Sequence, residues 1–337
     1  MHLKRFFRTI GCLRSFFSGI TLSRAPEEKA KAAPAHLPPS YMMIVRLCGG
    51  LGNQLFQYAV GKQLSVKNNI PLKIDDSWLR LPDARKYRLQ FFQIEEPLAS
   101  PQEVERFVGP YESQSLYARL YRKVQNMLPR HRRRYFQESG FWAYEPELMR
   151  IRSQVFLEGF WQHHAYFTRL HPQVLEALQL REEYRQEPYA VLDQIREDAA
   201  SVSLHIRRGD YVSDPYNLQF FGVMPLSYYQ QAVAYMQEQL HAPTFYIFSD
   251  DLDWARAHLK LQAPMVFVDI EGGRKEYLEL EAMRLCRHNI LANSSFSWWG
   301  AYLNTNPHKR VIAPRQWVAD PELKDKVQIQ MPDWILL

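Results

Sequence analysis

Short apolar runs that alternate with segments of helical spacing dominate the second half of the chain. The runs predict strands over residues 202–206, 244–248, 265–268 and 290–292, and the segments between them predict helices from residue 225 and over 252–259, 275–287 and 297–303. Strands that alternate with helices form a parallel, doubly wound sheet. We therefore predict a Rossmann-like α/β domain in this half.

The first half carries the same signal more weakly. Residues 42–47 form an apolar strand candidate, and a glycine-rich turn at 48–54 leads into apolar residues at helical spacing. Further strands are predicted over 72–75 and 155–157, while the pattern blurs from 84 to 150. This half is predicted to hold a second parallel sheet.

Length and composition agree with two folded domains. A chain of 337 residues, with 46% hydrophobic and 23% charged residues, fits neither global disorder nor a bundle of membrane helices. We place a basic extension at residues 1–41, an N-terminal domain at 42–195 and a C-terminal domain at 196–337.

Most of the positive charge lies in the extension. Residues 1–40 carry seven Lys or Arg and two Glu, so they contribute +5 to the net charge of +6. The remaining chain is nearly neutral, which argues against a nucleic-acid partner. The three cysteines, Cys12, Cys48 and Cys286, are too far apart for a metal cluster or a disulfide framework and favour a reducing compartment.

The extension is open to three interpretations. It is basic and contains four phenylalanines, and Arg14 interrupts the one stretch that resembles the core of a secretory signal. It could be an interfacial membrane anchor, a disordered tail, or an upstream start before a true beginning at Met42 or Met43, and we favour a disordered or artefactual tail. With no apolar run of about 18 residues, we expect a cytoplasmic protein and leave open a peripheral contact at the inner face of the membrane.

A heptad at 205–211 stands where the strand 202–206 should end. It contains Arg207 and Arg208, and paired guanidiniums suit a diphosphate through forked, charge-assisted hydrogen bonds. A solvated surface turn is the alternative. The carboxyl ends of the other predicted strands add Ser249, Asp250, Asp251, Asn293, Ser294 and Ser295. In an open α/β sheet that edge binds ligands, so an anion site is predicted there.

The segment 293–300 joins a predicted strand to a predicted helix. Its hydroxyls and the free amides of the helix start can bind phosphate without a metal. Simple N-capping by Ser295 or Ser297 is the alternative. One serine is enough to cap a helix, and the segment has three beside an asparagine, so we favour a ligand site.

Other motifs are weaker. The turn with Gly50, Gly52, Asn53 and Gln54 suits an anion or a sugar hydroxyl but has neither P-loop nor Rossmann spacing, and tight turns need glycine for packing alone. Trp161 could stack on a pyranose or belong to the core. We interpret the Asp75-Asp76 pair as solvated, and the basic run 130–134 as a solvated loop in preference to a patch for acidic lipid or substrate.

Four segments together resemble the bacterial-type α-1,2-fucosyltransferases over about residues 43 to 314. They are Gly-Gly-Leu-Gly-Asn-Gln-Leu-Phe-Gln-Tyr-Ala at 49–59, His-Ile-Arg-Arg-Gly-Asp-Tyr-Val at 205–212, Phe-Ser-Asp-Asp at 248–251 and Ala-Asn-Ser-Ser-Phe-Ser-Trp-Trp-Gly-Ala at 292–301. The resemblance implies a GT-B fold, which has two Rossmann-like domains facing a cleft. It also implies GDP-fucose as donor and fucose transfer to the 2-hydroxyl of a terminal β-galactose, with inversion and without a metal or other cofactor. The acceptor would be an oligosaccharide or glycolipid, as in O-antigen or lipopolysaccharide biosynthesis.

The resemblance also implies roles for residues. Arg207 would hold the β-phosphate, Arg208 would support the motif, and Glu279 and His205 would read guanine. The remaining donor-binding candidates are Asp250, Asn293, Ser294, Ser295, Phe296, Gly50 and Gly52, and the acceptor-binding candidates are Gln54, Trp161 and Gln162. Asp210 is a candidate base, and Asn53 could orient the acceptor hydroxyl or the leaving phosphate.

The sequence departs from the family in two places. Glu279 stands where an aspartate is usual and Arg284 where a small residue is usual, which leaves the guanine-reading residue open. Residues 158–164 replace a Gly-Tyr-Phe-Gln-like stretch and could reshape the acceptor side. The competing hypotheses are another nucleotide-sugar glycosyltransferase or fucosyl linkage and, in a different class, a non-catalytic carbohydrate-binding protein.

Overall fold

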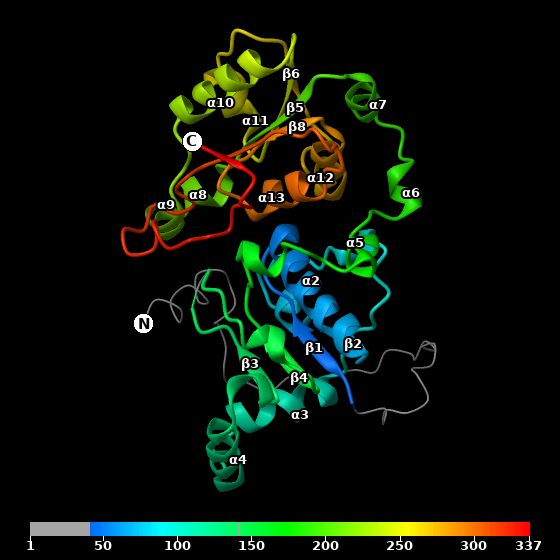
Figure 1. The fold of residues 1–337 in the computed structure, drawn as a ribbon, viewed down its shortest axis with the longest axis vertical. Helices are drawn as coiled ribbons and strands as arrows, with labels where there is room; N and C mark the ends of the chain where they lie inside the picture. The colour runs from blue at the N-terminus through cyan, green and yellow to red at the C-terminus, as the bar shows by residue number, and fades with distance from the viewer. Residues whose placement is uncertain (1–40, 141) are drawn as a thin grey trace. The chain divides into compact units, whose positions relative to one another are not determined.

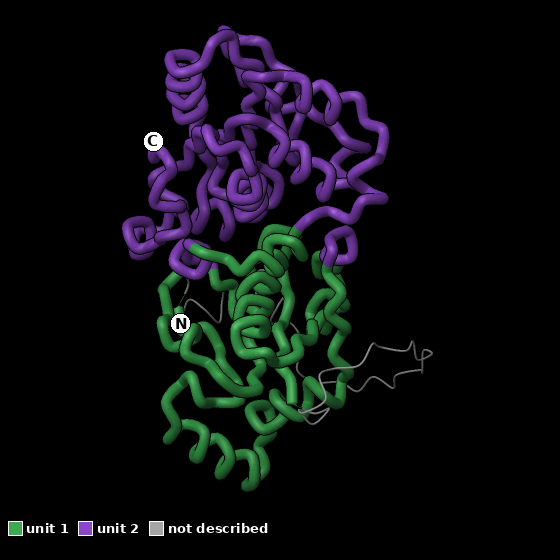
Figure 2. Tube along the Cα trace, turned by 45° about the vertical axis from the view of Figure 1, so that its right-hand side comes forward, with its two compact units in different colours: residues 1–87, 94–161, 169–178 green, residues 88–93, 162–168, 179–337 purple. Residues whose placement is uncertain are grey.

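The computed structural model describes residues 41–140 and 142–337. By their contacts these residues form two compact units, which Figure 2 shows in different colours. Unit 1 runs to residue 87 and also contains residues 94–161 and 169–178. Unit 2 contains residues 88–93, 162–168 and 179–337. Each unit has its own parallel sheet, so the predicted α/β class and the two Rossmann-like domains are confirmed.

Unit 1 is built on a four-stranded sheet with the order β2-β1-β4-β3 (Figure 1). The strands are β1 (Met43–Arg46), β2 (Leu72–Asp75), β3 (Tyr135–Gln137) and β4 (Val155–Glu158). All neighbours are parallel, with Met43 opposite Leu72 on one side and Val155 on the other. Both β1 and β4 are buried along their whole length, as expected for the centre of a parallel sheet.

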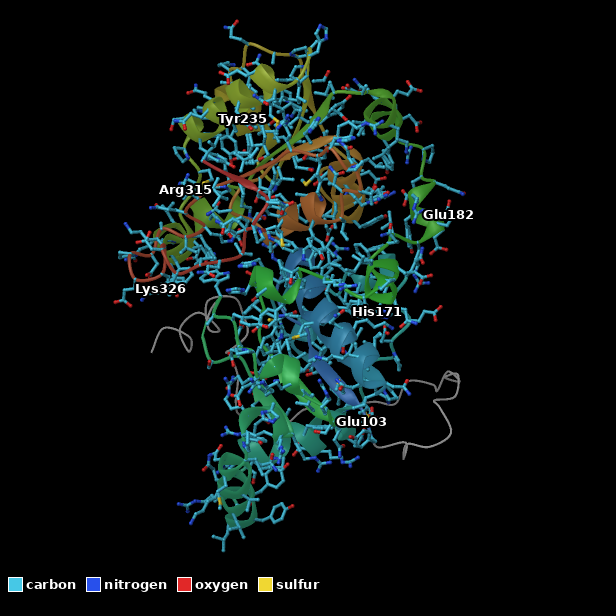
Figure 3. The ribbon with its side chains drawn as sticks, viewed as in Figure 1. Glu103, His171, Glu182, Tyr235, Arg315 and Lys326 are labelled. Atoms are coloured by element: carbon cyan, nitrogen blue, oxygen red, sulfur yellow. The ribbon has the colours of Figure 1, made fainter. Side chains whose placement is uncertain are left out.

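The helices of unit 1 are α2 (Leu51–Asn68), α3 (Pro101–Glu112), α4 (Leu116–Met127) and α5 (Pro172–Ala177). The unit also contains the 3₁₀ turns η1 (Ser77–Arg80), η3 (Arg130–Arg132) and η4 (Leu148–Arg150). Helix α3 starts with a capping box in which the Ser100 hydroxyl accepts from the Glu103 amide and the Glu103 carboxylate accepts from the Ser100 amide. Figure 3 labels Glu103 on this helix. Local capping of this kind explains a helix inside the stretch 84–150, where apolar periodicity alone predicts nothing.

Unit 2 has a six-stranded parallel sheet with the order β10-β9-β8-β5-β6-β7. Its strands are β5 (Ser201–Ile206), β6 (Thr244–Ser249), β7 (Met265–Phe267), β8 (His288–Ile290), β9 (Val311–Ala313) and β10 (Ile335–Leu336). The core beneath β5 and β6 consists of apolar strand residues packed on Tyr229, Ala232, Val233 and Met236 of α10 (Leu226–Gln239). The helical face predicted from that spacing is therefore confirmed.

The helices of unit 2 are α6 (Glu182–Arg185), α7 (Ala190–Glu197), α8 (Gly209–Ser213), α9 (Pro215–Phe221), α10 (Leu226–Gln239), α11 (Leu252–His258), α12 (Glu276–Leu285) and α13 (Ser295–Tyr302). The short turns η2 (Leu89–Phe91) and η5 (His164–Tyr166) also belong to it. Helices α6 and α7 contact α12. These contacts assign residues 179–195 to unit 2, whereas the sequence analysis had assigned them to the first domain.

The interpretations of the basic extension concern residues 1–40, which lie outside the described residues. Within residues 41–140 and 142–337, no helix combines the length and the apolar character that crossing a membrane requires.

Candidate active site

The polar edge of unit 2 lies at a topological switch point. The chain runs from β5 through β6 to β7 on one side of the sheet, and from β8 through β9 to β10 on the other. Because β5 pairs with both β6 and β8 in parallel, the carboxyl ends of these three strands meet at one edge. In open α/β sheets, ligands bind outside the carboxyl ends of the strands at this kind of reversal.

Arg207 follows β5 directly and is held by two carboxylates. Its terminal nitrogens lie 2.5 Å from Asp210 Oδ1 and 2.8 Å from Asp250 Oδ2. Burial acts to lower the pKa of Arg207, but Asp250 and Asp210 outweigh it and keep the pKa above its ordinary value. The guanidinium is therefore a fixed cation. Each terminal nitrogen carries a second N–H, so the two ion pairs do not exhaust its donors.

Asp250, at the end of β6, also shapes the backbone beside Arg207. Its Oδ1 accepts a 2.8 Å hydrogen bond from the Arg208 amide, while its Oδ2 pairs with Arg207. A Cβ added at Gly209 would overlap the Asp250 carboxylate. The close approach explains why glycine follows the two arginines, and it gives Asp250 a positioning role beside its predicted role in donor binding.

Arg208 is turned toward the first turn of α11. Its Nε lies 3.2 Å from Asp251 Oδ2, and its guanidinium stacks 3.8 Å above the Trp254 ring. This arrangement agrees with a supporting role for Arg208. Sequence reasoning missed Trp254. The residue that could have pointed to it is Asp251, a typical N-cap residue at the start of α11. Its side chain accepts from the Trp254 amide and so holds Trp254 in the first turn of the helix.

The start of α13 is capped, but by Ser294 and not by Ser295 or Ser297 as the alternative to a ligand site had it. Ser294 is the N-cap, its hydroxyl accepts from the Phe296 amide, and the Ser297 hydroxyl donates to the Ser294 carbonyl. The hydroxyls of Ser294 and Ser297 are thus used locally. Ser295 and Phe296 are half-buried at the first positions of the helix, where the positive end of the helix dipole favours an anion.

Asn293 has a structural role in unit 2. Its side chain is fully buried, and Nδ2 donates to the carbonyls of Phe221, Gly222 and Trp317. Its amide therefore ties the end of α9 and the loop at Trp317 to the carboxyl edge of β8. Because Asn293 Nδ2 is used in these bonds, the structure does not support the predicted contact between this nitrogen and the donor substrate.

His205 and Glu279 both have pKa values shifted toward the neutral form. Burial, with help from Arg207, lowers the pKa of His205 to about 3, so its ring is neutral, and within the described part of the chain its Nδ1 has no hydrogen-bond partner. Burial followed by Glu276, Asp269 and Asp250 raises the pKa of Glu279 to about 8.

The glycine turn of unit 1 is held by two glutamines of α2. Gln54 Nε2 donates to the carbonyls of Gly49 and Lys86, both at 2.9 Å. Gln57 Oε1 accepts from the Cys48 amide. Gln54 is fully buried, and its two hydrogen bonds hold the turn in place. This structural role accounts for Gln54 without the contact to the acceptor substrate that the sequence suggested.

Gly49 is the glycine that this turn requires. It has a φ of +75°, and a Cβ there would overlap the side chain of Asn53. Gly50 is the N-cap of α2 in an extended conformation, and Gly52 is buried in its first turn. The spacing of the motif did not separate Gly49 from its neighbours, because left-handed φ is invisible in sequence.

The two acceptor-binding candidates in the turn after β4, Trp161 and Gln162, are both buried. Trp161 is fully buried, packs 6.0 Å from the Phe136 ring centroid, and has its backbone amide bound by Glu138 Oε1. Stacking of Trp161 on a pyranose is therefore wrong for this structure, and the core alternative holds. Gln162 is also buried and belongs to unit 2, whereas Trp161 belongs to unit 1.

A buried ion triad occupies the carboxyl edge of the unit 1 sheet. Arg46, at the end of β1, lies 2.7 Å from Asp75 and 2.6 Å from Glu158, at the ends of β2 and β4. Asp76 is buried as well and pairs with Arg80. The expectation that Asp75 and Asp76 are solvated is thus wrong, because parallel pairing brings Arg46 beside Asp75.

The polar edge of unit 2, with two arginines and a helix start at a switch point, is typical of nucleotide-sugar glycosyltransferases. The model of glycosyl transferase family 11 matches residues 132–337. The chain belongs to this family and is a glycosyltransferase.

Two bacterial relatives cover most of the chain. The Escherichia coli O-antigen biosynthesis glycosyltransferase WbnK is 30% identical over 86% of this chain and 99% of its own length. An Escherichia coli alpha-1,2-colitosyltransferase is 30% identical over 84% of this chain and 94% of its own length. Among solved structures, the NodZ alpha-1,6-fucosyltransferase with GDP is similar over 77% of this chain and 91% of its own, with 15% identity and a TM-score of 0.46.

Proposed function

We propose that the protein is an inverting α-1,2-fucosyltransferase that uses GDP-fucose and transfers fucose to the 2-hydroxyl of a terminal β-galactose. The observation that carries the proposal is the pair of ordered arginines at the switch point of unit 2, with Arg207 fixed between Asp210 and Asp250. The name of the second bacterial relative, an alpha-1,2-transferase, supports the linkage. O-antigen synthesis in the first relative supports a surface glycan as acceptor.

The donor's diphosphate would bind between Arg207 and the start of α13. As the bond from the fucose anomeric carbon to the phosphate oxygen stretches, negative charge grows on the β-phosphate. The N–H groups of Arg207 and the positive end of the α13 dipole stabilise this charge more in the transition state than in the ground state. Because these donors are already in place before binding, no metal is needed to neutralise the leaving GDP.

The 2-hydroxyl of galactose attacks the anomeric carbon from the opposite face and inverts it. Its proton must leave as the new glycosidic bond forms, and Asp210 is a candidate acceptor for it. The side chain of Asp210 already binds Arg207 through Oδ1. A base role would therefore use the other carboxylate oxygen or follow partial opening of this pair.

Transfer of colitose is a second candidate, because one of the two bacterial relatives is an alpha-1,2-colitosyltransferase. Colitose is the 3-deoxy form of fucose, so both donors carry the same GDP and the same diphosphate. The phosphate site therefore does not distinguish them. Discrimination would depend on a hydrogen bond to the fucose 3-hydroxyl, which a site built for fucose makes and a colitose site lacks.

The test is a donor and acceptor matrix with the full chain. GDP-fucose, GDP-colitose and a UDP-sugar are each incubated with lactose or N-acetyllactosamine, with and without EDTA, and the product linkage is located by NMR. We expect an α-1,2-fucosyl product that EDTA does not reduce. A colitosyl product alone would establish the second candidate, and GDP binding without any transfer would favour a carbohydrate-binding protein.

A methyl group at Gly209 is expected to weaken catalysis through Asp250. In Gly209→Ala the new Cβ would push Asp250 away and free both Arg207 and the Arg208 amide. We expect kcat/KM for GDP-fucose to fall about 10- to 100-fold, because a displacement near 1 Å has effects of this size. Gly140→Ala is the control, since a Cβ there makes only an ordinary 3.7 Å contact with Ala143. Equal kinetics of the two variants would exclude this role of the Gly209 contact.

The raised pKa of Glu279 predicts a pH dependence of donor binding. Guanine N1–H and N2–H need an ionised carboxylate, and with a pKa of about 8 Glu279 is mostly protonated near neutral pH. Raising the pH from about 6.5 to about 8.5 ionises it, so the Kd of GDP-fucose should fall about 10- to 30-fold.

Calorimetric titration of the wild type and Glu279→Gln checks the pH dependence. GDP-fucose suits the measurement because its diphosphate is esterified at both ends and does not titrate in this range, unlike that of GDP. The variant should bind weakly and with a flat profile. A wild-type Kd that does not change with pH would remove Glu279 as the guanine-reading residue.

A further inference from the structure

Helix α4 exposes its apolar face. Five of the ten exposed large hydrophobic residues in the described chain lie on it, with Leu116 81%, Leu120 61% and Met127 79% exposed. Leu116, Leu120, Val124 and Met127 are spaced by three or four positions and therefore form one stripe along the helix. A surface helix normally turns such a stripe toward the core.

The buried face of α4 is small and partly polar. Its buried residues are Ala118 and Gln125, and the Gln125 side-chain oxygen accepts from the Arg134 amide. Arg122 donates to the carbonyls of Pro110 and Ser113, next to the end of α3. Hydrogen bonds thus hold α4 in this orientation, so the outward stripe is a fixed feature of unit 1.

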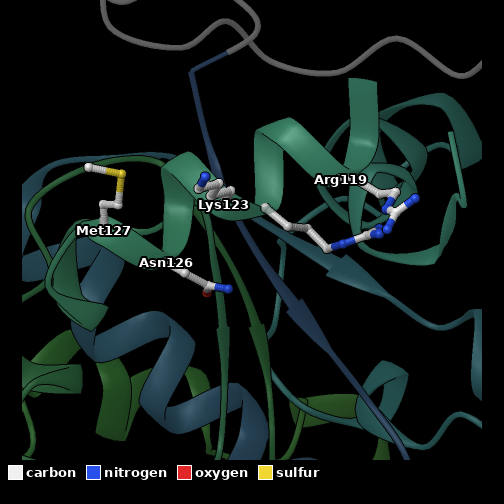
Figure 4. A pocket seen from close by; sticks show the side chains of 5 residues that line it. Arg119, Lys123, Asn126 and Met127 are labelled. Carbon is white, nitrogen blue, oxygen red and sulfur yellow. The ribbon is translucent and has the colours of Figure 1, made fainter. Parts of the chain in front are cut away.

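Cations lie along one side of the stripe. No Asp or Glu occurs from residue 113 to residue 137, which includes α4 and the basic run 130–134. Arg119, Arg122 and Lys123 line a hollow on α4 together with Asn126 and Met127 (Figure 4). Within the described part of the chain, Arg119 and Lys123 have no carboxylate within ion-pair distance. Two unpaired cations thus flank an apolar stripe.

The basic run is only partly the solvated loop that the sequence suggested. Arg130 pairs with Glu145 and covers the Phe136 ring, and Arg133 donates to the Leu128 and Asn126 carbonyls. These arginines fasten the segment after α4. Arg132 is exposed and extends the cationic surface beyond the helix.

We propose that α4 docks the protein on the surface of an anionic lipid bilayer. Leu116, Leu120 and Met127 would enter the boundary between headgroups and acyl chains, while Arg119 and Lys123 would lie at the level of the lipid phosphates. A short amphipathic helix with long apolar side chains on one face and cations beside them has the composition of an interfacial helix.

Charge decides against the other occupants that the chain itself offers. The extension 1–40 carries a net +5 and is repelled by a cationic surface. A second copy would bring the same cations against this face. An acidic protein would satisfy the cations, but the strongly exposed Leu116, Leu120 and Met127 can enter hydrocarbon without a matching groove in a partner. The lipid surface is thus the occupant that fits both the apolar and the charged groups.

Co-sedimentation of the full chain with vesicles tests the proposal. Vesicles of phosphatidylcholine are compared with vesicles that contain about 30% phosphatidylglycerol, whose negative headgroups attract basic residues. The wild type should sediment with the anionic vesicles. Leu116→Ser/Leu120→Ser should lower the partition coefficient at least tenfold, and Arg119→Glu/Lys123→Glu should lower it about 25-fold or more, at about fivefold for each cation lost.

Matched controls separate α4 from general surface changes. Leu98→Ser/Leu175→Ser removes two leucines that are 42% and 37% exposed elsewhere, and Arg256→Glu/Lys260→Glu makes the same charge change on unit 2. All variants keep residues 1–40, so any binding by the extension is common to them. Wild-type partition of the α4 variants, equal losses in the controls, or binding to an acidic protein without binding to vesicles would each overturn the proposal.

Discussion

Replacing Arg207 by lysine is expected to lower kcat for transfer from GDP-fucose by about 10²- to 10³-fold, the effect of removing one preorganised donor to a developing oxyanion. Lysine keeps the charge but is a point donor, so it cannot hold Asp210, Asp250 and the diphosphate at once. The expected loss is therefore one of geometry rather than of net charge. Steady-state kinetics at saturating acceptor measure it.

The same variant should remain folded. Its ammonium can still pair with one of the two carboxylates, so we expect Tm to fall by less than about 4 °C. Arg256→Lys is the control, because Arg256 is an exposed residue of α11 that pairs with Asp253 away from the switch point. Near-normal turnover in Arg207→Lys would disprove its assignment to the phosphate.

Replacing Arg46 by methionine is expected to cost about 3–5 kcal/mol of unfolding free energy, the range for removing one partner from a buried ion pair. The variant would leave Asp75 and Glu158 buried without their cation. Arg46 also lies between the rings of Trp78 and Phe156, at 4.7 and 4.8 Å, so no water can replace it easily. Urea unfolding at pH 7 measures the difference.

The origin of this loss can be separated from lost packing. If uncompensated charge dominates, Arg46→Met/Asp75→Asn/Glu158→Gln should recover most of the stability, since neutral replacement of a buried ionic group is often harmless. A triple variant as unstable as the single one would show that packing of Arg46 between the rings is what matters.

Local patterns predicted the central elements of both sheets well. The strands over 42–47 and 155–157 match β1 and β4, and the strands over 202–206 and 244–248 match β5 and β6, each within one residue. These strands are buried on both faces, so their apolar runs are long and unambiguous. The strand predicted over 290–292 is instead β8 at His288–Ile290. Its first two residues, His288 and Asn289, are polar, so an apolar pattern does not include them in the strand.

The shortest strands and the middle of unit 1 were not predictable in this way. Strands β3, β9 and β10 have three, three and two residues, too few for a period to appear. Helix α4 exposes its apolar stripe to solvent. A prediction that places every apolar helix face in the core is therefore wrong for this helix. The spacing of apolar residues along α4 is the same as that of a helix packed on a core, so it does not show that this face is exposed.

By itself, the sequence determined the family, the two parallel α/β sheets, and the gathering of Arg207, Asp250 and the α13 start at one edge, because these depend on short motifs and on the parallel order of strands. Only the tertiary structure decided what each polar residue does there. Asn293 and Gln54 donate to backbone carbonyls far along the chain, Trp161 packs in a core, and Arg46 joins residues from three strands. These partners are far apart in the sequence and meet only in the folded chain, so neither the composition nor the spacing of residues predicts them.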